Sequence, residues 1–459
     1  MPTTRALAMD PLLRFSGLDI SFQGFPDPAS FSPEVGERQL RAAARETNDD
    51  PVPRRLSLYL HVPFAEQPCF HCPGTFTVGA DSGKVRAYFD RLARECELAA
   101  PLFDRDRDVI QLKVGGGGPS KIDPAALGEL LYAASRHFFL SRGREREFMI
   151  ELPVGEHCAE EISGFADLGF NRARFTVFDF EGSTEALLQR RLVQAELAAA
   201  VEDARTAGFR SICFDALYGL PGRSDTDLLK WLELLLEQRP DRISLHPFGG
   251  RMRLASAASG PPVRALGERI GQRAVAVRAL LAAGYDPIGL DVFALPQDDL
   301  SRVRRSGQLH RNALGYTPHA ETDLIGLGVS AQSRIGDACF QNQVDLPAWE
   351  SAVDMGELPI WRGLWMDADA RLRSDLLHDL LCKGEVDSAV LEARHEVDFA
   401  VYFQTELEAL APLCDGDLVS FDGRRLRVSE AGRLSLRAIA EPFARMGKRQ
   451  RWPERSASL

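Results

Sequence analysis

The sequence predicts an α/β protein built on a partial (β/α)6 barrel, followed by a C-terminal, mainly helical, winged-helix-like domain. In the first part of the 459-residue chain, short apolar runs rich in β-branched residues alternate with longer amphipathic stretches. This alternation is typical of right-handed crossovers onto a parallel sheet. After about residue 366 the pattern changes to helices and short strands, which indicates a second structural unit.

Six segments have the length and composition of buried strands in a parallel sheet. They are "LSLYLHV" (56–62), "VIQLKVG" (109–115), "EFMIELP" (147–153), "RARFTVF" (172–178), "SICFDALYG" (211–219) and "RISLHPF" (242–248). Amphipathic stretches separate them, for example the one that ends at Gly208, a typical helix stop. Six such units predict a barrel or part of one.

The sequence pattern of the C-terminal part predicts two helical stretches, a hairpin and a final helix. In "FDGRRLRV" the Asp422-Gly423 pair between apolar residues favours a tight turn. Some winged-helix folds bind DNA, but the acidity of this chain favours a packing or lid role. We therefore expect an N-terminal arm (1–50), a barrel with an extension (51–365) and a C-terminal domain (366–459).

Charge and hydropathy exclude several classes of protein. The net charge is -11 and no long Lys/Arg stripe occurs, which argues against a nucleic-acid partner. No apolar run reaches the roughly 18–20 residues of a membrane span, and the first residues lack the pattern of an export signal. We expect a cytoplasmic protein that acts on a small molecule, and the sequence carries no signal of oligomeric state.

Polar residues follow or end several of the predicted strands. The pair Cys69 and Cys72 follows the first, the glycine-rich 115–120 segment follows the second, Glu151 lies in the third and Asp215 in the fifth. The carboxyl ends of parallel strands meet at one edge, so these residues predict one site. A buried carboxylate requires a partner, and for each acid we expect a ligand contact, with a structural ion pair as the alternative.

Several segments, taken in order, resemble the oxygen-independent coproporphyrinogen III oxidase (coproporphyrinogen dehydrogenase) family of radical S-adenosylmethionine (SAM) enzymes. The segments are "LYLHVPF", "GGGGPS", "IELP", "LGFNRARFTVFDF", "AGFRSICFDALYGLPG", "GQLHRNALGYTPHAETDLIGLGVSA", "QNQ" and "DLVSFDGRRLRVSEAGRL". The resemblance implies a radical-SAM-type incomplete barrel, a C-terminal helical domain, one [4Fe-4S] cluster and two SAM molecules.

The family's cluster cysteines follow the spacing C-x-x-x-C-x-x-C. Three thiolates hold three irons, and the fourth iron chelates SAM. Here Cys69 and Cys72 match two of these positions, the first is Ala65, and Gly74 stands where the porphyrinogen enzymes have a further cysteine. A methyl group cannot ligate iron, so metal binding by the remaining cysteine pair predicts a labile [4Fe-4S] cluster or none.

Most SAM contacts of the family are retained. The resemblance assigns them to Tyr59, His71, Gly116, Gly117, Glu151, Arg190 and Asp215. In the family these glycines lie beside the methionyl amino group, the arginine holds the carboxylate, and the aspartate holds the ribose. Arg191 is an alternative for the arginine. Four other positions depart from the pattern: Gly118, Phe178, Leu314 and Gln332. The retained contacts predict that SAM binds.

Three functional hypotheses follow. The first is a SAM-binding enzyme with non-radical, polar chemistry, such as alkyl transfer or SAM-assisted rearrangement, with Glu151 and Asp179 as candidate acid–base groups. The second keeps the family activity, oxidative decarboxylation of coproporphyrinogen, with a cluster held by incomplete or borrowed ligation or with Ala65 in place of an original cysteine. The third is a non-catalytic tetrapyrrole or SAM binder, for which the sequence shows no dedicated haem motif.

Overall fold

The structure is a computed structural model that describes residues 24–65, 77–116, 122–177, 193–248, 265–320 and 322–446. All six predicted strands are present: β1 (Leu56–His61), β4 (Asp108–Gly115), β6 (Glu147–Leu152), β7 (Arg172–Val177), β8 (Ser211–Tyr218) and β9 (Arg242–Pro247). They lie parallel and adjacent, in the order β1-β4-β6-β7-β8-β9. The predicted α/β class with a partial barrel is confirmed.

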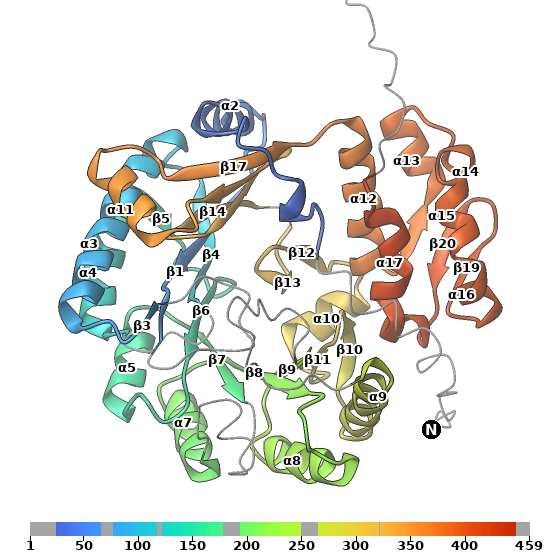
Figure 1. Cartoon of the computed structure of the whole chain (residues 1–459), viewed down its shortest axis with the longest axis horizontal. Coiled ribbons are helices and arrows are strands. Elements are labelled where there is room, and N and C mark those ends of the chain that lie inside the picture. Colours follow the sequence, from blue (N-terminus) through green and yellow to red (C-terminus); the bar gives the residue numbers. More distant parts are fainter. Residues whose placement is uncertain are drawn as a thin grey trace, which may run out of the picture.

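Helices cover the outer face of this sheet (Figure 1). They are α3 (Ser82–Ala99), α4 (Pro124–Ser135), α5 (Ala159–Asp167), α7 (Gln194–Thr206), α8 (Asp225–Glu237) and α9 (Leu266–Ala282). The side chains of Asp81, Asp123 and Ser224 cap three of them by accepting backbone N–H groups. Helix α7 ends two residues before Gly208, whose φ is +90°, as the sequence predicts.

The sheet extends beyond the six parallel strands at both edges. Next to β1 lie parallel β14 (Asp323–Leu327) and then antiparallel β15 (Gln332–Ile335), β16 (Ala338–Asn342) and β17 (Ile360–Trp365). Beyond β9 lie β11 (Val292–Ala294) and β10 (Asp286–Gly289). The hairpin of β12 (His310–Asn312) and β13 (Gly315–Thr317) lies between these two ends (Figure 1).

The remaining elements of the first part are short or peripheral. They are η1 (Pro28–Ser30), α2 (Glu37–Asn48), β2 (Phe64–Ala65), β3 (Thr77–Val78), η2 (Ala100–Leu102), β5 (Phe139–Leu140), α10 (Asp299–Arg305) and α11 (Leu346–Asp354). Helix α2 lies in the predicted N-terminal arm, yet it packs Leu40 and Ala44 into the same core as the barrel.

The C-terminal part is helical with a small sheet, as predicted. Its elements are α12 (Ala368–Cys382), β18 (Glu385–Asp387), α13 (Ser388–His395), α14 (Phe399–Tyr402), α15 (Gln404–Ala409), α16 (Ala411–Asp415), β19 (Val419–Phe421), β20 (Arg425–Val428), η3 (Gly432–Ser435) and α17 (Leu436–Ala444). The predicted hairpin is β19–β20, and Gly423 in its turn has a φ of +88°. The sheet order β18-β20-β19 completes a wing-like unit.

A second hydrophobic core joins this unit to the end of the barrel. Ile288 and Tyr316 belong to the same cluster of buried residues as Leu376, Phe403 and Phe443. Apolar side chains from both sides of the predicted domain boundary, between residues 365 and 366, therefore pack into one core. The division into three parts stays a prediction. No helix in the described ranges is long and apolar enough to cross a membrane.

Candidate functional site

A row of polar side chains crosses the six parallel strands, one from each. The row, called the polar row below, consists of Tyr59, Lys113, Glu151, Arg174, Asp215 and His246. On β1 the neighbours Leu58 and Leu60 are both 1% exposed. Because side chains alternate between the faces of a strand, the polar row faces away from those apolar neighbours. The row is partly exposed, with side-chain exposures of 12% at Glu151 and 36% at His246.

Glu151 is the anion at the centre of the polar row. Its Oε1 lies 2.8 Å from Lys113 Nζ, and its Oε2 accepts the Gly116 N–H at 3.1 Å. Burial alone would raise the pKa of this carboxyl, but Lys113 and Arg174 outweigh burial and lower the pKa to about 2. A group with that pKa is ionised near neutrality and accepts a proton weakly, which favours cation binding over the predicted acid–base role.

Asp215 forms the second anionic point of the row. Its Oδ1 lies 2.6 Å from Arg174 Nη1 and 3.4 Å from His246 Nε2. Burial would raise the pKa of Asp215, but Arg174 and His246 lower it overall. Glu151 and Asp215 therefore both have the ion-pair partner that the sequence analysis gave as the alternative. Each also keeps 12–16% of its side chain exposed, which leaves room for a ligand contact.

The aromatic end of the row is Tyr59. Its hydroxyl shares a hydrogen bond with His61 Nδ1 at 2.9 Å, and Lys113 Nζ lies 5.8 Å from the centre of its ring. Burial, and then the charge of Glu151, raise the pKa of Tyr59. The phenol is therefore neutral and acts as a hydrogen-bonding group and an apolar surface at the end of β1.

Two glycines at the end of β4 permit close approach of the backbone. A Cβ at Gly116 would collide with the carbonyl oxygen of Val62, and a Cβ at Gly115 would collide with the Glu151 carboxylate. Only glycine fits both positions without displacing neighbours. The predicted function of the glycine-rich segment, uncovered backbone next to a ligand, is consistent with this geometry at Gly116.

Ala65 ends β2 and pairs with Val78 of β3. The segment between them, which carries Cys69, His71, Cys72 and Gly74, lies outside the described residues. The predicted site residues Gly117, Gly118, Phe178, Asp179, Arg190 and Arg191 also lie outside the described residues. Within the described ranges, no cluster of three or more His, Cys, Asp or Glu suits a metal ion.

A second polar layer beneath the row was not predicted from the sequence. Gln111 Nε2 donates to Glu147 Oε2 at 2.9 Å, and Thr317 Oγ1 donates to the same oxygen at 2.6 Å. Asn312 Nδ2 donates to Gln111 Oε1 at 2.7 Å. This layer fastens the β12–β13 hairpin to β4 and β6. The sequence spacing could have revealed this layer. Gln111 precedes Lys113 by two residues and Glu147 precedes Glu151 by four, and even spacings along a strand keep side chains on the same face.

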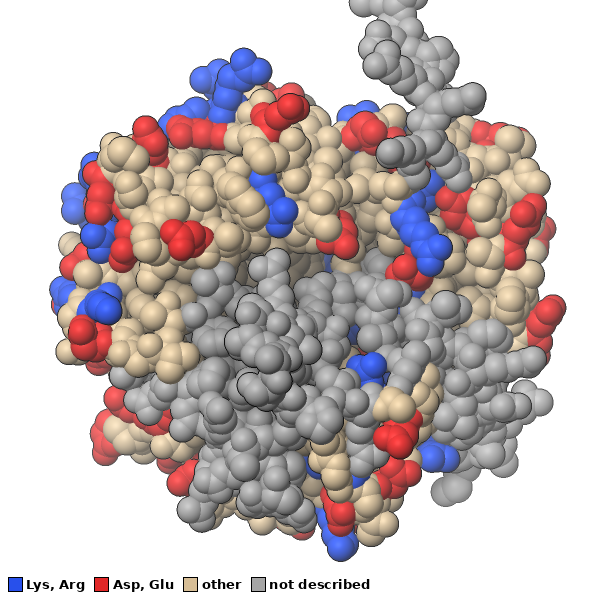
Figure 2. Space-filling model, viewed as in Figure 1, with Lys and Arg blue, Asp and Glu red and all other residues tan. Residues whose placement is uncertain are grey.

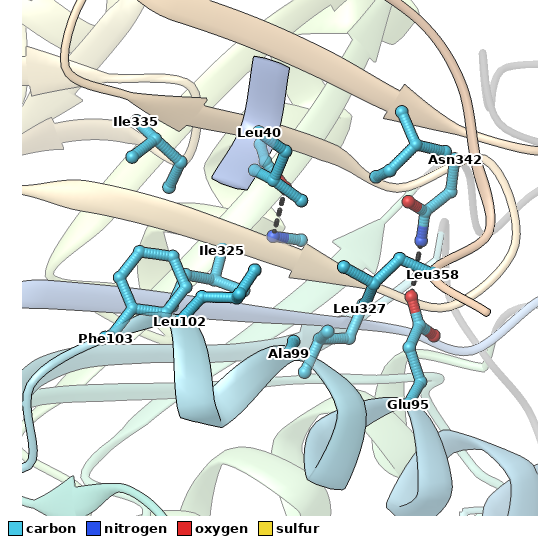
Figure 3. Close-up of a pocket in the computed structure, with 13 residues that line it drawn as sticks. Leu40, Glu95, Ala99, Leu102, Phe103, Ile325, Leu327, Ile335, Asn342 and Leu358 are labelled. Atoms are coloured by element: carbon cyan, nitrogen blue, oxygen red, sulfur yellow. Dashed lines mark hydrogen bonds between the residues drawn. The ribbon is translucent and has the colours of Figure 1, made fainter. Parts of the chain in front are cut away.

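A buried carboxylate on α3 holds the turn that follows β14. Glu95, 1% exposed, accepts hydrogen bonds from Gly328 N–H at 2.7 Å, Trp349 Nε1 at 3.0 Å and Asn342 Nδ2 at 2.6 Å. It lines a cavity of about 20 Å³, room for about one water molecule (Figure 3). The cavity is too small for a substrate, and we assign it a structural role.

The charged side chains on one face of the molecule are of both signs. Figure 2 shows acidic and basic side chains interspersed on this face, without a continuous basic stripe among the described residues. Two positions that depart from the family pattern lie on elements other than the six parallel strands. Leu314 lies in the β12–β13 turn, where its N–H donates to Asn312 Oδ1 at 2.9 Å, and Gln332 begins β15.

Comparison with known proteins assigns the family. No family model matches the chain. The oxygen-independent coproporphyrinogen III oxidase of Escherichia coli is 34% identical over 430 residues, which cover 92% of each chain. The corresponding Pseudomonas aeruginosa protein is 31% identical over 427 residues, again 92% of each chain. This chain belongs to the oxygen-independent coproporphyrinogen III oxidase family.

The fold supports the same family. The solved structure of the Escherichia coli coproporphyrinogen III oxidase, described as a radical SAM enzyme, matches with a TM-score of 0.85 and 31% identity, over 92% of this chain and 97% of the other. The resemblance predicted from the sequence is confirmed. The protein is a SAM-dependent enzyme of the radical SAM superfamily, and of its predicted SAM contacts the structure brings Tyr59, Gly116, Glu151 and Asp215 together.

Proposed function

We propose that this protein performs the reaction for which its relatives are named, the oxygen-independent oxidation of coproporphyrinogen III. The family resemblance implies that this reaction is a SAM-dependent oxidative decarboxylation. The observation that carries the proposal is similarity over 92% of both chains, which includes the C-terminal unit as well as the barrel. It favours the second hypothesis drawn from the sequence over the first, non-radical one.

The polar row suits the charged groups of SAM. The ionised Glu151 carboxylate matches the ligand's ammonium group, and Gly116 offers approach without a Cβ. The Lys113 ammonium already occupies Glu151 Oε1 and would repel a second cation there. We therefore place the ligand's ammonium beside Glu151 Oε2, which also accepts the Gly116 N–H. Asp215, held by Arg174, is oriented to accept a hydrogen bond from a ribose hydroxyl.

The cluster positions fit less well. When bound, a [4Fe-4S] cluster supplies the electron that cleaves SAM. Ala65 offers iron no donor atom, which leaves Cys69 and Cys72 as the matching thiolates. The family activity therefore requires incomplete or borrowed ligation, and the absence of a cluster stays a prediction.

Ala65 is also the one observation that favours a second candidate function. If SAM binds without an electron source, its sulfonium remains an electrophile, and the protein transfers an alkyl group or rearranges a substrate by holding a nucleophile against it. Asp179 stays the candidate acid–base group of this alternative.

One experiment separates the two candidates. The protein is prepared and reconstituted without oxygen, then assayed for iron, sulfide, deoxyadenosine and loss of coproporphyrinogen III, beside Ala65→Cys as a variant with the complete spacing. A cluster and deoxyadenosine in the wild type support the family activity. If only Ala65→Cys forms deoxyadenosine while the wild type still binds SAM, the fold is competent for the radical reaction and the family activity is refuted for the wild-type chain.

A further inference from the structure

Four arginines gather where the barrel meets the C-terminal unit. Arg273 of α9 and Arg437 of α17 form ion pairs with Asp291, in the turn between β10 and β11. Arg433 of η3 donates to the Ile288 carbonyl just before this turn. Arg311 of β12 lies over the ring of Tyr316, whose hydroxyl lies next to Gly289 at the start of the turn. We call this group the arginine cluster. Neither the four arginines nor Asp291 belong to the polar row.

The acid within the arginine cluster is Asp291. Asp291 Oδ1 lies 2.6 Å from Arg273 Nη2, and its Oδ2 lies 3.5 Å from Arg437 Nε. Arg433 instead donates to the carbonyl of Ile288 at 3.2 Å. Asp291 therefore pairs with two of the four guanidinium groups.

Arg311 is the least compensated member. Its guanidinium lies 5.9 Å from the centre of the Tyr316 ring, and within the described parts of the chain it has no hydrogen bond or ion pair to an acid. Burial lowers the pKa of Arg311, and the positive charge of Arg437 lowers it further. A buried cation without a counter-ion is costly, and an anionic ligand would offset that cost.

The geometry around Arg437 is rigid and reachable. Leu290 and Asp291 have φ values of +47° and +65°, so the two-residue turn holds non-glycine residues in the left-handed region. The Leu290 carbonyl of this turn accepts Arg437 Nη2 at 3.0 Å. The Arg437 side chain is 16% exposed and Arg311 is partly exposed, so both can meet a ligand.

The arginine cluster borders the end of the polar row. The N–H of Leu245 donates to the Asp291 carbonyl at 2.9 Å, and the next residue is His246, the last member of the row. The charge of His246 also contributes to the lowered pKa of Asp291, after Arg273 and Arg437. A ligand of tetrapyrrole size that lies beside the row therefore comes within reach of the arginines.

We propose that Arg311 and Arg437 form a carboxylate subsite that binds an acidic side chain of the tetrapyrrole substrate. Guanidinium groups present paired donors that match a carboxylate. The inference rests on the proposed function, because it takes its substrate class from there.

The test is a fluorescence titration of the full-length protein with coproporphyrin III, the oxidised and stable tetracarboxylate, which needs neither a cluster nor turnover. Arg311→Gln is compared with Arg311→Lys and with Arg371→Gln, which removes an arginine from a 47% exposed position on α12. We expect Arg311→Gln to weaken binding about tenfold or more, Arg311→Lys to recover part of it, and Arg371→Gln to match the wild type. SAM binding stays unchanged and the melting temperature of Arg311→Gln does not fall.

Unchanged coproporphyrin binding in Arg311→Gln, or no binding by the wild type, overturns the subsite. So does a loss of SAM binding with coproporphyrin binding intact, because the arginine would then hold the SAM carboxylate. A lowered melting temperature without recovery in Arg311→Lys assigns the residue a structural role. Arg311-dependent binding without conversion of coproporphyrinogen leaves the subsite standing and refutes the proposed function instead.

Discussion

Substituting Glu95 by glutamine tests how a buried carboxylate near the candidate site affects stability. Burial raises the pKa of Glu95 from 4.5 to about 7, although its three hydrogen bonds act in the opposite direction. A carboxyl whose pKa is raised by folding contributes stability that is complete below pH 4.5 and is lost as the pH rises through 7. The difference corresponds to about 3 kcal/mol of unfolding free energy at pH 8.

The glutamine variant removes this pH-dependent cost but loses one hydrogen bond. In the wild type, Asn342 Nδ2 donates to one oxygen of Glu95, and the Gly328 N–H and Trp349 Nε1 donate to the other. The glutamine places an NH2 group, which cannot accept, at one of these two positions. One lost hydrogen bond costs about 1 kcal/mol. We therefore expect Glu95→Gln to be less stable than the wild type by about 1 kcal/mol at pH 4 and more stable by about 2 kcal/mol at pH 8.

The assay is urea unfolding followed by tryptophan fluorescence, since Trp349 donates directly to Glu95. Glu97→Gln, on the same helix with a side chain 44% exposed, is the matched control and should show no crossover. If the stability difference between Glu95→Gln and the wild type is the same at pH 4 and pH 8, Glu95 is not held with a raised pKa and the reasoning fails.

Three further predictions concern the polar row. Glu151→Gln should weaken SAM binding about tenfold or more in calorimetry, whereas Glu129→Gln, at a 62% exposed position, should not; equal affinities would remove Glu151 from the SAM site. Gly116→Ala should lower the unfolding free energy because its Cβ meets the Val62 carbonyl, while Gly267→Ala, with open space around it, should be neutral or slightly stabilising; a neutral Gly116→Ala would contradict the close approach. Asp215→Asn and Arg174→Gln should each lower the unfolding free energy by about 2 kcal/mol, because each removes one partner of a charged hydrogen bond. The double variant should lose less than the two single variants added together; additive losses would mean that the ion pair carries no coupling.

The parallel strands were predictable because strands buried on both faces are nearly continuous apolar runs. The Asp422-Gly423 turn was predictable because few dipeptides favour that hairpin. The extension from β14 to β17 was not predicted from strand patterns. It lies after a long interval of mixed composition, and its pairing with β1 joins residues more than 260 positions apart, which local patterns do not encode.

The candidate site was predicted in part for a related reason. Glu151 and Asp215 stood out as acids inside apolar strands, and their convergence follows from the parallel topology. Lys113, Arg174 and His246 did not stand out, because a single basic residue in a strand is as compatible with a solvated edge as with a barrel interior. Their role depends on which strands are neighbours, such as the alignment of Glu151 with Arg174 between β6 and β7.

The most direct measurement is the yield of deoxyadenosine and decarboxylated product when the wild-type protein, prepared and reconstituted without oxygen, is incubated with SAM, a reductant and coproporphyrinogen III. Membership of the family predicts that both products form together and depend on the added substrate. Bound SAM that stays intact beside unconsumed coproporphyrinogen would contradict the proposed function.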